Sequence, residues 1–433
     1  MKAMTYDAAV SYLYNLQKHG IKLGLETMTA LIARLGRPDT RYRILHIAGT
    51  NGKGSTAAMS AAMLQAAGHR VGLYTSPHLV EFSERIRVDG RMISEADIGR
   101  FAEVVQKAAE PDLSPTFFEC TTAMALQYFA EAQVDVAVLE VGLGGRFDAT
   151  NVVTPVACAV TTIALDHQEY LGTTLSSVAY EKAGIIKPLV PVVVGRMSDE
   201  ARETIEQVAE ERGAPLSRLG REFEVAGMPE RFRFSGRTRR YDNLVCSLSG
   251  AHQVDNCACA LSLIEAAGER GLDVGETAVR EGLRTVQWPG RLEVVDRTPL
   301  VVLDGAHNPA AAAAVAEYMQ AFRRVNPESR VILVLGMMRD KDHLGFAKPF
   351  QGLVDQVVLT QAGLSRSATV DELYGALHEL WPSARAEAVL ADALTLARRL
   401  ARTQDLICVT GSLMLIGDVK ALRHVGRISP LRG

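Results

Sequence analysis

The chain has 433 residues, which at about 150 residues per domain predicts two or three domains and excludes a peptide hormone or a lone binding module. Its 47 Lys and Arg residues against 50 Asp and Glu residues leave a formal net charge of −3, so charge favours neither nucleic acid nor an anionic membrane as a partner. A content of 48% hydrophobic and 22% charged residues is typical of a soluble globular protein and excludes a largely disordered chain.

The N-terminal segment does not resemble an export signal, because Asp7 and polar neighbours interrupt the apolar stretch that such a signal needs. The chain also has no run of about 20 apolar residues, so we expect a cytoplasmic protein without a membrane partner. Its six cysteines are too dispersed for a disulfide framework, and the one close pair, Cys257 and Cys259, lacks the second pair or histidine cluster of a zinc site. Most of them lie in apolar runs, which favours buried, reduced thiols. We expect a monomer.

The first half of the chain alternates short β-branched runs with longer Ala- and Leu-rich stretches of helical period. This pattern is typical of a parallel sheet covered by helices on both faces. Strands are predicted at Arg43–Ala48, Arg70–Tyr74, Asp135–Glu140, Val156–Ile163 and Val190–Gly195. A helix is predicted over Ser55–Ala67, and Gly68 supplies its C-terminal stop.

The middle of the chain changes character between Arg218 and Ser249, where polar and apolar residues alternate. This alternation predicts an antiparallel patch at the edge of the sheet, followed by a helix over Gln253–Ala267. A break at Gln287–Arg291 then precedes a second series of strands and helices.

The last part of the chain repeats the α/β pattern. Strands are predicted at Leu300–Leu303, Val331–Leu335, Gln356–Leu359 and Leu406–Thr410, and a helix over Pro309–Phe322. We therefore expect an α/β protein with two domains. Residues 1–290 would form a larger domain with a P-loop-type, mostly parallel sheet, and residues 291–433 a smaller, Rossmann-like, doubly wound domain.

A glycine-rich segment directly follows the first strand of the series. It reads Gly49-Thr50-Asn51-Gly52-Lys53-Gly54-Ser55 and opens the helix, so backbone N–H groups and the helix N-terminus would face one anion. Lys53 would neutralise β- and γ-phosphate oxygens, and the hydroxyls of Ser55 and Thr56 are candidate Mg²⁺ ligands. The segment departs from the common phosphate-loop pattern at Ile47 and Gly54. An ordinary glycine-rich turn is the alternative, but strand, lysine, hydroxyl and helix in this order favour a triphosphate site.

Polar residues also lie at or after the ends of two later predicted strands, Asp135–Glu140 and Val156–Ile163. Glu140 precedes a second glycine-rich turn, and at the carboxyl edge of the sheet it would face the phosphate loop and hold Mg²⁺. The alternative is a solvated glutamate. His167 is equally consistent with a second metal site and with a structural hydrogen bond. On the residues alone, Glu181 and Lys182 indicate the exposed surface of a helix.

Taken together, these segments resemble the folate branch of the Mur ligase superfamily, the dihydrofolate synthases and folylpolyglutamate synthases, over nearly the whole chain. Seven motifs occur in the family's order. They are Gly49–Ser55, Thr75-Ser76-Pro77-His78-Leu79, Gly142–Asn151, Leu165-Asp166-His167, Glu181-Lys182-Ala183-Gly184, Asp304-Gly305-Ala306-His307-Asn308-Pro309 and Thr410-Gly411-Ser412.

The resemblance implies an ATP- and Mg²⁺-dependent ligase that joins the α-amine of glutamate to a pteroate or folate carboxylate through an acyl phosphate. One Mg²⁺ would bind Ser55 and Glu140, and a second would bind Ser76, Glu140 and His167. The resemblance also implies that CO₂ carbamylates Lys182, which would become an anion near the second metal and require a locally neutral amine.

Further contacts are implied by position in the family's motifs. Asn256 would contact adenine, Arg291 and Asp304 the nucleotide, and His307 and Ser412 the glutamate. Phe118 would stack on the pterin and Asp148 would accept hydrogen bonds from its amino-pyrimidine edge. A core aromatic and a turn-stabilising aspartate are the respective alternatives. Lys53, Lys182, His167 and His307 are the expected catalytic residues.

Three rival functions follow from the same residues. A cell-wall Mur ligase would need a complete domain before the phosphate loop, and we expect the 48 residues before Gly49 to be too few for one. A nucleotide-gated switch would release phosphate without needing glutamate. Within the family, Thr116–Glu119 and Asp148 favour a bifunctional enzyme, and the alternative is a folylpolyglutamate synthase only. We also expect closure of two domains about a hinge at Trp288–Arg291.

Overall fold

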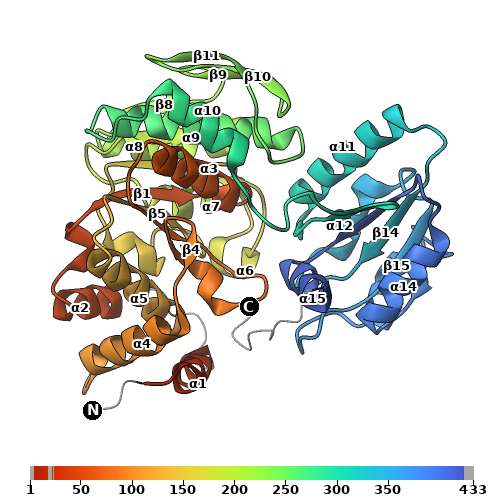
Figure 1. The fold of residues 1–433 in the computed structure, drawn as a ribbon, viewed down its shortest axis with the longest axis horizontal. Helices are drawn as coiled ribbons and strands as arrows, with labels where there is room; N and C mark the ends of the chain where they lie inside the picture. Colours follow the sequence, from red (N-terminus) through yellow and green to blue (C-terminus); the bar gives the residue numbers. More distant parts are fainter. Residues whose placement is uncertain (1–3, 18–21, 23, 424–433) are drawn as a thin grey trace. The chain divides into compact units, whose positions relative to one another are not determined.

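The computed structural model describes residues 4–17, 22 and 24–423, and they form two compact units (Figure 1). Unit 1 consists of Met1–His78, Phe82–Ser247 and Gln253–Val286, and unit 2 of Leu79–Glu81, Leu248–His252 and Gln287–Gly433. Among the described residues, no helix has both the length and the apolar character needed to cross a membrane.

Unit 1 is built on an eight-stranded sheet. In spatial order its strands are β4 (Arg91–Met92), β3 (Ile86–Val88), β2 (Val71–Tyr74), β5 (Val136–Glu140), β1 (Arg43–Ala48), β6 (Ala157–Val160), β7 (Val192–Val194) and β8 (Leu216–Arg218). Six neighbouring strands run parallel, namely β2, β5, β1, β6, β7 and β8. At one edge, β3 pairs antiparallel with β2, and β4 pairs antiparallel with β3. The predicted, mostly parallel sheet is confirmed.

Helices cover both faces of this sheet, and Figure 1 shows α3 above and α5 below strands β1 and β5. The helices of this part of the chain are α1 (Tyr6–Gln17), α2 (Glu26–Arg34), α3 (Lys53–Ala66), α4 (Glu95–Ala109), α5 (Phe117–Glu131), α6 (Gln168–Leu171), α7 (Leu175–Ala183), α8 (Asp199–Glu211), α9 (His252–Gly268) and α10 (Glu276–Thr285). Because both faces are covered, β1 is a continuous run of buried residues after its first position, as expected for a central parallel strand.

One predicted strand is too long. The expected Val156–Ile163 shortens to β6, which ends at Val160, because the following residues bind the phosphate loop instead of a neighbouring strand. The backbone N–H of Thr50 donates to the Thr162 carbonyl, and the N–H of Asn51 donates to the Thr162 hydroxyl. The end of this strand is therefore a support for the loop.

The predicted antiparallel patch exists, but it forms a separate three-stranded sheet of β9 (Glu224–Met228), β10 (Arg231–Ser235) and β11 (Arg240–Leu244) and not an edge of the main sheet. Glu265 of α9 anchors its β10–β11 turn, because the buried carboxylate accepts the backbone N–H groups of Arg237, Thr238 and Arg239. This carboxylate has a purely structural role.

Unit 2 contains a six-stranded sheet with strands in the order β12 (Glu293–Arg297), β13 (Leu300–Leu303), β17 (Leu406–Thr410), β14 (Val331–Leu335), β15 (Gln356–Leu359) and β16 (Arg385–Ala386). All pairs except β12–β13 are parallel. Its helices are α11 (Pro309–Val325), α12 (His343–Ala347), α13 (Val370–Leu377), α14 (Leu390–Leu400) and α15 (Leu413–Arg423).

Alternation along β14 shows that this second sheet is doubly wound. Leu333 and Leu335 pack in one core with α11, α12 and α13, whereas Ile332 and Val334 pack in another with α14 and α15. Successive side chains of a strand point to opposite faces, so helices cover both faces. The predicted fold of the second part is confirmed.

Candidate functional site

The phosphate loop of unit 1 has a backbone that favours glycine at two positions. Gly49 has φ 146° and Gly52 has φ 86°, and a side chain at Gly49 would collide with Thr161. Thr50 fixes the loop further, because its hydroxyl donates to the Ala164 carbonyl and accepts the Ala164 N–H. The loop is therefore held by the segment that follows β6.

Helix α3 begins within this segment, at Lys53, with Gly52 as its N-cap, which has no side chain to cap the helix. The first-turn N–H groups of a helix need acceptors from outside the helix and favour an anion. Ser55 is buried in this turn. The adjacent Thr56 hydroxyl is also buried, and it makes no hydrogen bond with any described residue. This first turn fits a phosphate group.

Two lysines converge on one carbonyl of the loop. Lys53 Nζ lies 3.0 Å from the Gly49 carbonyl oxygen and 3.1 Å from that of Thr50, and Lys182 Nζ lies 3.0 Å from the same Gly49 oxygen. Only 4% of Lys182 is exposed, so the expectation of an exposed helix surface, made from the residues alone, is wrong. Helix α7 packs against the sheet at this point and turns Lys182 inward.

Burial, together with the nearby positive charge of Lys53, lowers the pKa of Lys182 to about 7. The negative charges of Asp166 and Asp148 act in the opposite direction. A substantial fraction of Lys182 is consequently a neutral amine near neutral pH, in contrast to an exposed lysine. Its neighbour Glu181 is turned away and pairs with Arg146 at 2.5 Å.

Glu140 ends β5 at the carboxyl edge of the sheet and is 5% exposed. Its Oε2 accepts the backbone N–H of Ser76, the second residue after β2, at 3.2 Å. Since β5 lies between β1 and β2, the structure brings Glu140 and Ser76 together on one side and the phosphate loop to the other. His167 lies at the same edge beyond β6, with φ 48° and a half-exposed side chain.

This donor set fits Mg²⁺ that is bound together with phosphate oxygens. No group of three or more His, Cys, Asp and Glu side chains within residues 4–17, 22 and 24–423 is arranged to hold a metal alone. Mg²⁺ commonly takes only one or two carboxylates from the protein and completes its shell with water and substrate phosphates. One glutamate, one histidine and serine hydroxyls beside a phosphate loop match that preference.

Asn256 of α9 lies against Gly52, because a Cβ added there would lie 2.3 Å from Asn256 Oδ1. The sequence analysis missed Gln253, one turn earlier. This fully buried amide receives a hydrogen bond from Asn256 and donates to the Ser55 hydroxyl at 3.4 Å. Its spacing of three residues from Asn256 on a predicted helix is a signal that would have identified it.

Gly52→Ala is expected to weaken binding of a nonhydrolysable ATP analogue at least tenfold, because the new methyl group displaces Asn256 or the loop. Gly68→Ala is the matched control, since Gly68 has a similar φ of 90° but nothing lies within 4 Å of its added Cβ. Both variants carry a similar backbone strain, of about 1–2 kcal/mol. Equal analogue affinities in the two variants, measured by calorimetry, would contradict this reading of the loop.

The second glycine-rich turn is held by Asp148. Its Oδ2 accepts the N–H groups of Gly142 and Leu143, and its Oδ1 accepts both the N–H and the hydroxyl of Thr150. Four hydrogen bonds use the acceptor capacity of a carboxylate, which favours the turn-stabilising alternative for Asp148. Its contact with the pterin stays a prediction.

Phe118 lies beside this turn, because a Cβ on Gly142 would lie 2.4 Å from its ring. Phe118 is half-buried in the first turn of α5, and its ring centroid is 6.1 Å from that of Tyr74. One face of the ring is therefore packed. Its role as a stacking surface also stays a prediction.

The predicted residues of unit 2 lie together at the carboxyl ends of β13 and β17. Asp304 accepts the N–H groups of Leu292 and Ala306, and the Gly411 N–H donates to the Ala306 carbonyl, which joins the two strand ends. This places His307 near Ser412, which is 2% exposed. Arg291 lies against the same turn, where its Nη1 would be 2.7 Å from a Cβ on Gly305.

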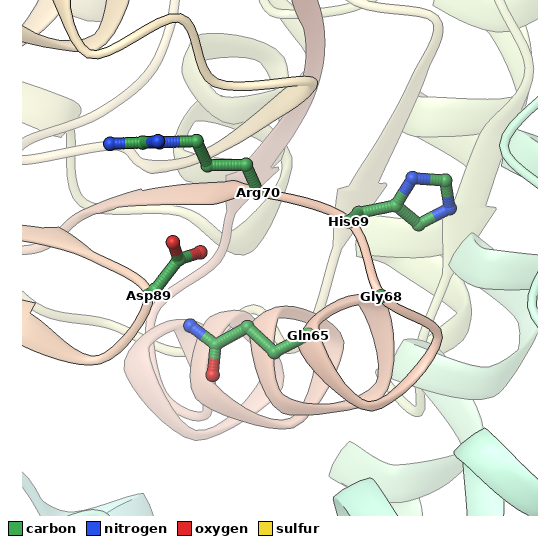
Figure 2. Close-up of a pocket in the computed structure, with 5 residues that line it drawn as sticks. All are labelled: Gln65, Gly68, His69, Arg70 and Asp89. Atoms are coloured by element: carbon green, nitrogen blue, oxygen red, sulfur yellow. The ribbon is translucent and has the colours of Figure 1, made fainter.

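A hollow of about 400 Å³ in unit 1 does not belong to this site (Figure 2). Four of its lining residues, Gln65, Gly68, His69 and Arg70, lie at the end of α3 and before β2, and the fifth, Asp89, directly follows β3. Helix α3 has 14 residues, so the hollow is about 20 Å from the phosphate loop. Ligands of open α/β sheets bind at the opposite edge, where the strands end.

Comparison with known proteins gives matches over nearly the whole chain. Residues 47–264 match the Mur ligase middle domain, and residues 290–413 match the Mur ligase glutamate ligase domain. The dihydrofolate synthase/folylpolyglutamate synthase of Bacillus subtilis is 36% identical over 427 residues, which cover 96% of this chain and 98% of that protein.

Two solved structures have the same fold. One is E. coli FolC in complex with DHPP and ADP, with a TM-score of 0.89, 37% identity and 97% of each chain covered. The other is the bifunctional folylpolyglutamate synthase/dihydrofolate synthase of Yersinia pestis with AMPPNP and Mn ion, with a TM-score of 0.87, 35% identity, and 97% of this chain and 98% of that chain covered.

Proposed function

The chain belongs to the Mur ligase family, in the branch of the dihydrofolate synthases and folylpolyglutamate synthases, and we propose that it uses ATP to join L-glutamate both to dihydropteroate and to folates. The observation that carries the proposal is the meeting of a phosphate loop, Glu140 and Ser76 at one edge of the sheet. A folylpolyglutamate synthase without dihydrofolate synthase activity is the alternative. A monomeric state and a cytoplasmic location are part of the proposal.

The reaction must overcome the low reactivity of a carboxylate. ATP phosphorylates the carboxylate, and the amine of glutamate then displaces phosphate from the acyl phosphate. Both reactants of the first step are anions, so their charges must be neutralised before they can approach each other. In this chain Lys53 and the first turn of α3 supply that neutralisation on the nucleotide side.

Ser55, Ser76, Glu140 and His167 would hold divalent metal at this edge, as the fit of the donor set supports. Bound Mg²⁺ neutralises phosphate and carboxylate oxygens as a Lewis acid. Glu140 contributes in a second way, since it accepts the Ser76 N–H and so fixes the backbone that presents the Ser76 hydroxyl.

Carbamylation of Lys182 belongs to the same proposal. The neutral form of the Nζ amine attacks CO₂, forms a C–N bond and releases one proton, which leaves a carbamate anion. Burial and the neighbouring Lys53 support this chemistry, because both raise the fraction of neutral amine. The carbamate would also compensate the charge of Lys53.

Unit 2 would bind glutamate through His307 and Ser412, and the nucleotide through Arg291 and Asp304. The buried Asp304 carboxylate is already used to hold two backbone N–H groups, which supports a role in shaping this turn. In unit 1, Asn256 would contact adenine, and Phe118 and Asp148 the pterin. Of the two residues expected to contact the pterin, Phe118 is partly exposed and Asp148 is buried.

Incubation with ATP, Mg²⁺ and glutamate is expected to add glutamate to dihydropteroate in one tube and to tetrahydrofolate in another. Mass spectrometry of the products measures each activity separately. Product from tetrahydrofolate alone supports the monofunctional alternative. Phosphate release that is indifferent to glutamate, with no amide product in either tube, would overturn the proposal in favour of a nucleotide-gated switch.

A further inference from the structure

Arg85 is a buried cation that the reaction described above does not use. It ends a short 3₁₀ helix, Phe82–Arg85, directly before β3, and 3% of the residue is exposed. Its Nε donates to His78 Nδ1 at 2.8 Å. Because Nδ1 accepts this bond, His78 is a neutral acceptor in the contact and does not compensate the guanidinium charge.

The surroundings of Arg85 leave most of its donors unused. The ring of Phe117 lies 5.3 Å from the guanidinium carbon, which provides a weak cation–π contact. Burial lowers the pKa of Arg85, and electrostatic interactions with Tyr74, Glu84 and Glu140 oppose that effect. Within the part of the chain that the structure describes, no carboxylate pairs with Arg85, and Nε makes its one hydrogen bond.

A buried guanidinium without an ion pair is costly, and proteins usually satisfy such a group with an anion. The two Nη groups form a planar fork of donors that matches the two oxygens of a carboxylate. The structure therefore indicates an oxyanion ligand at Arg85.

The position of Arg85 in the sheet distinguishes between the two anions of the reaction. The phosphate loop follows β1, Glu140 ends the neighbouring β5, and Ser76 and His78 follow β2 on the far side of β5. Arg85 is bound to His78, so it lies on the side of Glu140 away from the nucleotide loop. Phe117 is also adjacent to Phe118, the expected pterin contact.

We propose that the Nη groups of Arg85 bind the carboxylate of the pteroate or folate substrate that is to be phosphorylated. This inference rests on the proposed function. Arg85 then supplies positive charge for the carboxylate substrate, on one side of Glu140, as Lys53 supplies it for the nucleotide on the other side. It positions the carboxylate with an oxygen directed towards the γ-phosphate and takes no part in proton transfer.

The test compares dihydropteroate with its carboxamide, which has the same shape but no charge. Wild-type protein is expected to bind dihydropteroate at least tenfold more tightly than the carboxamide, and Arg85→Gln to lose this preference. Affinity for the carboxamide and for a nonhydrolysable ATP analogue stays within about twofold of wild type. Arg87→Gln is the matched control, a neighbouring arginine whose Nε donates to the Glu84 carbonyl, and it keeps the preference.

Three outcomes would overturn the inference. Equal loss of affinity for dihydropteroate and carboxamide means that Arg85 only supports the fold, and a selective loss of ATP-analogue affinity means that it binds the nucleotide. If Arg85→Gln does not fold, Arg85→Lys takes its place in the test, because lysine keeps the positive charge but lacks the planar fork of donors. It is expected to retain part of the preference, and a full preference in this variant contradicts a forked contact. Failure of wild type to form any glutamylated product would instead overturn the proposed function.

Discussion

Glu140→Gln is expected to lower the rate of amide formation by two to three orders of magnitude while the protein stays folded. The substitution keeps the shape of the side chain and its acceptor for the Ser76 N–H, but removes the charge that would hold divalent metal. Loss of one group that stabilises transition-state charge typically has an effect of about this size. The rate is measured as glutamylated product at saturating ATP and over a range of Mg²⁺ concentrations.

A second buried glutamate provides the control for this experiment. Glu265 is also 5% exposed, but its carboxylate accepts N–H groups from the β10–β11 turn. Glu265→Gln should lower the melting temperature and leave the rate near that of wild type. An undiminished rate in Glu140→Gln, or equal losses in both variants, would show that Glu140 has no special role in the chemistry.

Lys182→Gln is expected to reduce the rate by at least a hundredfold, because it removes both the amine and the carbamate that we propose it carries. Lys187→Gln is the control, since Lys187 Nζ donates to the Asn151 carbonyl and is also partly buried. Wild-type protein depleted of CO₂ should lose activity and regain it when bicarbonate is added. The variant should not respond to bicarbonate.

The pH dependence of this recovery follows from the lowered pKa of Lys182. With a pKa of about 7, roughly nine tenths of the amine is neutral at pH 8 and one tenth at pH 6. Only the neutral amine attacks CO₂, so recovery at equal dissolved CO₂ should be several times faster at pH 8. A recovery rate that is independent of pH, or an active Lys182→Gln variant, would contradict carbamylation.

The sequence predicted the framework of the site because its strands carry strong signals. Strands β1, β13, β14, β15 and β17 begin and end where expected. A motif of the site follows β1, β13 and β17. Their short length and their enrichment in β-branched residues distinguish them from buried helix segments. The edge strands β3 and β4 were not predicted, because short, partly exposed segments carry little periodicity.

The environment of individual side chains was harder to predict. Lys182 looks like an exposed residue from its neighbours, and only the packing of α7 against the sheet shows that it is buried. Arg85 was missed for a related reason. The proposed role of Arg85 in anion binding depends on its contact with His78 and on the absence of an ion pair among the described residues. Neither can be predicted from spacing along the chain.

The attachment of the phosphate loop to the segment after β6 bears on which nucleotide the protein prefers. Gly49 packs closely against Thr161, and Thr50 is hydrogen-bonded to Ala164, so the loop is already ordered in the folded chain. It therefore loses little conformational entropy when it binds a triphosphate. A rigid cradle of this kind holds ATP and GTP equally well, since their phosphates are identical. Discrimination between the two bases must therefore arise elsewhere, and the side-chain amides of Gln253 and Asn256 beside the loop have the donors and acceptors that such discrimination needs.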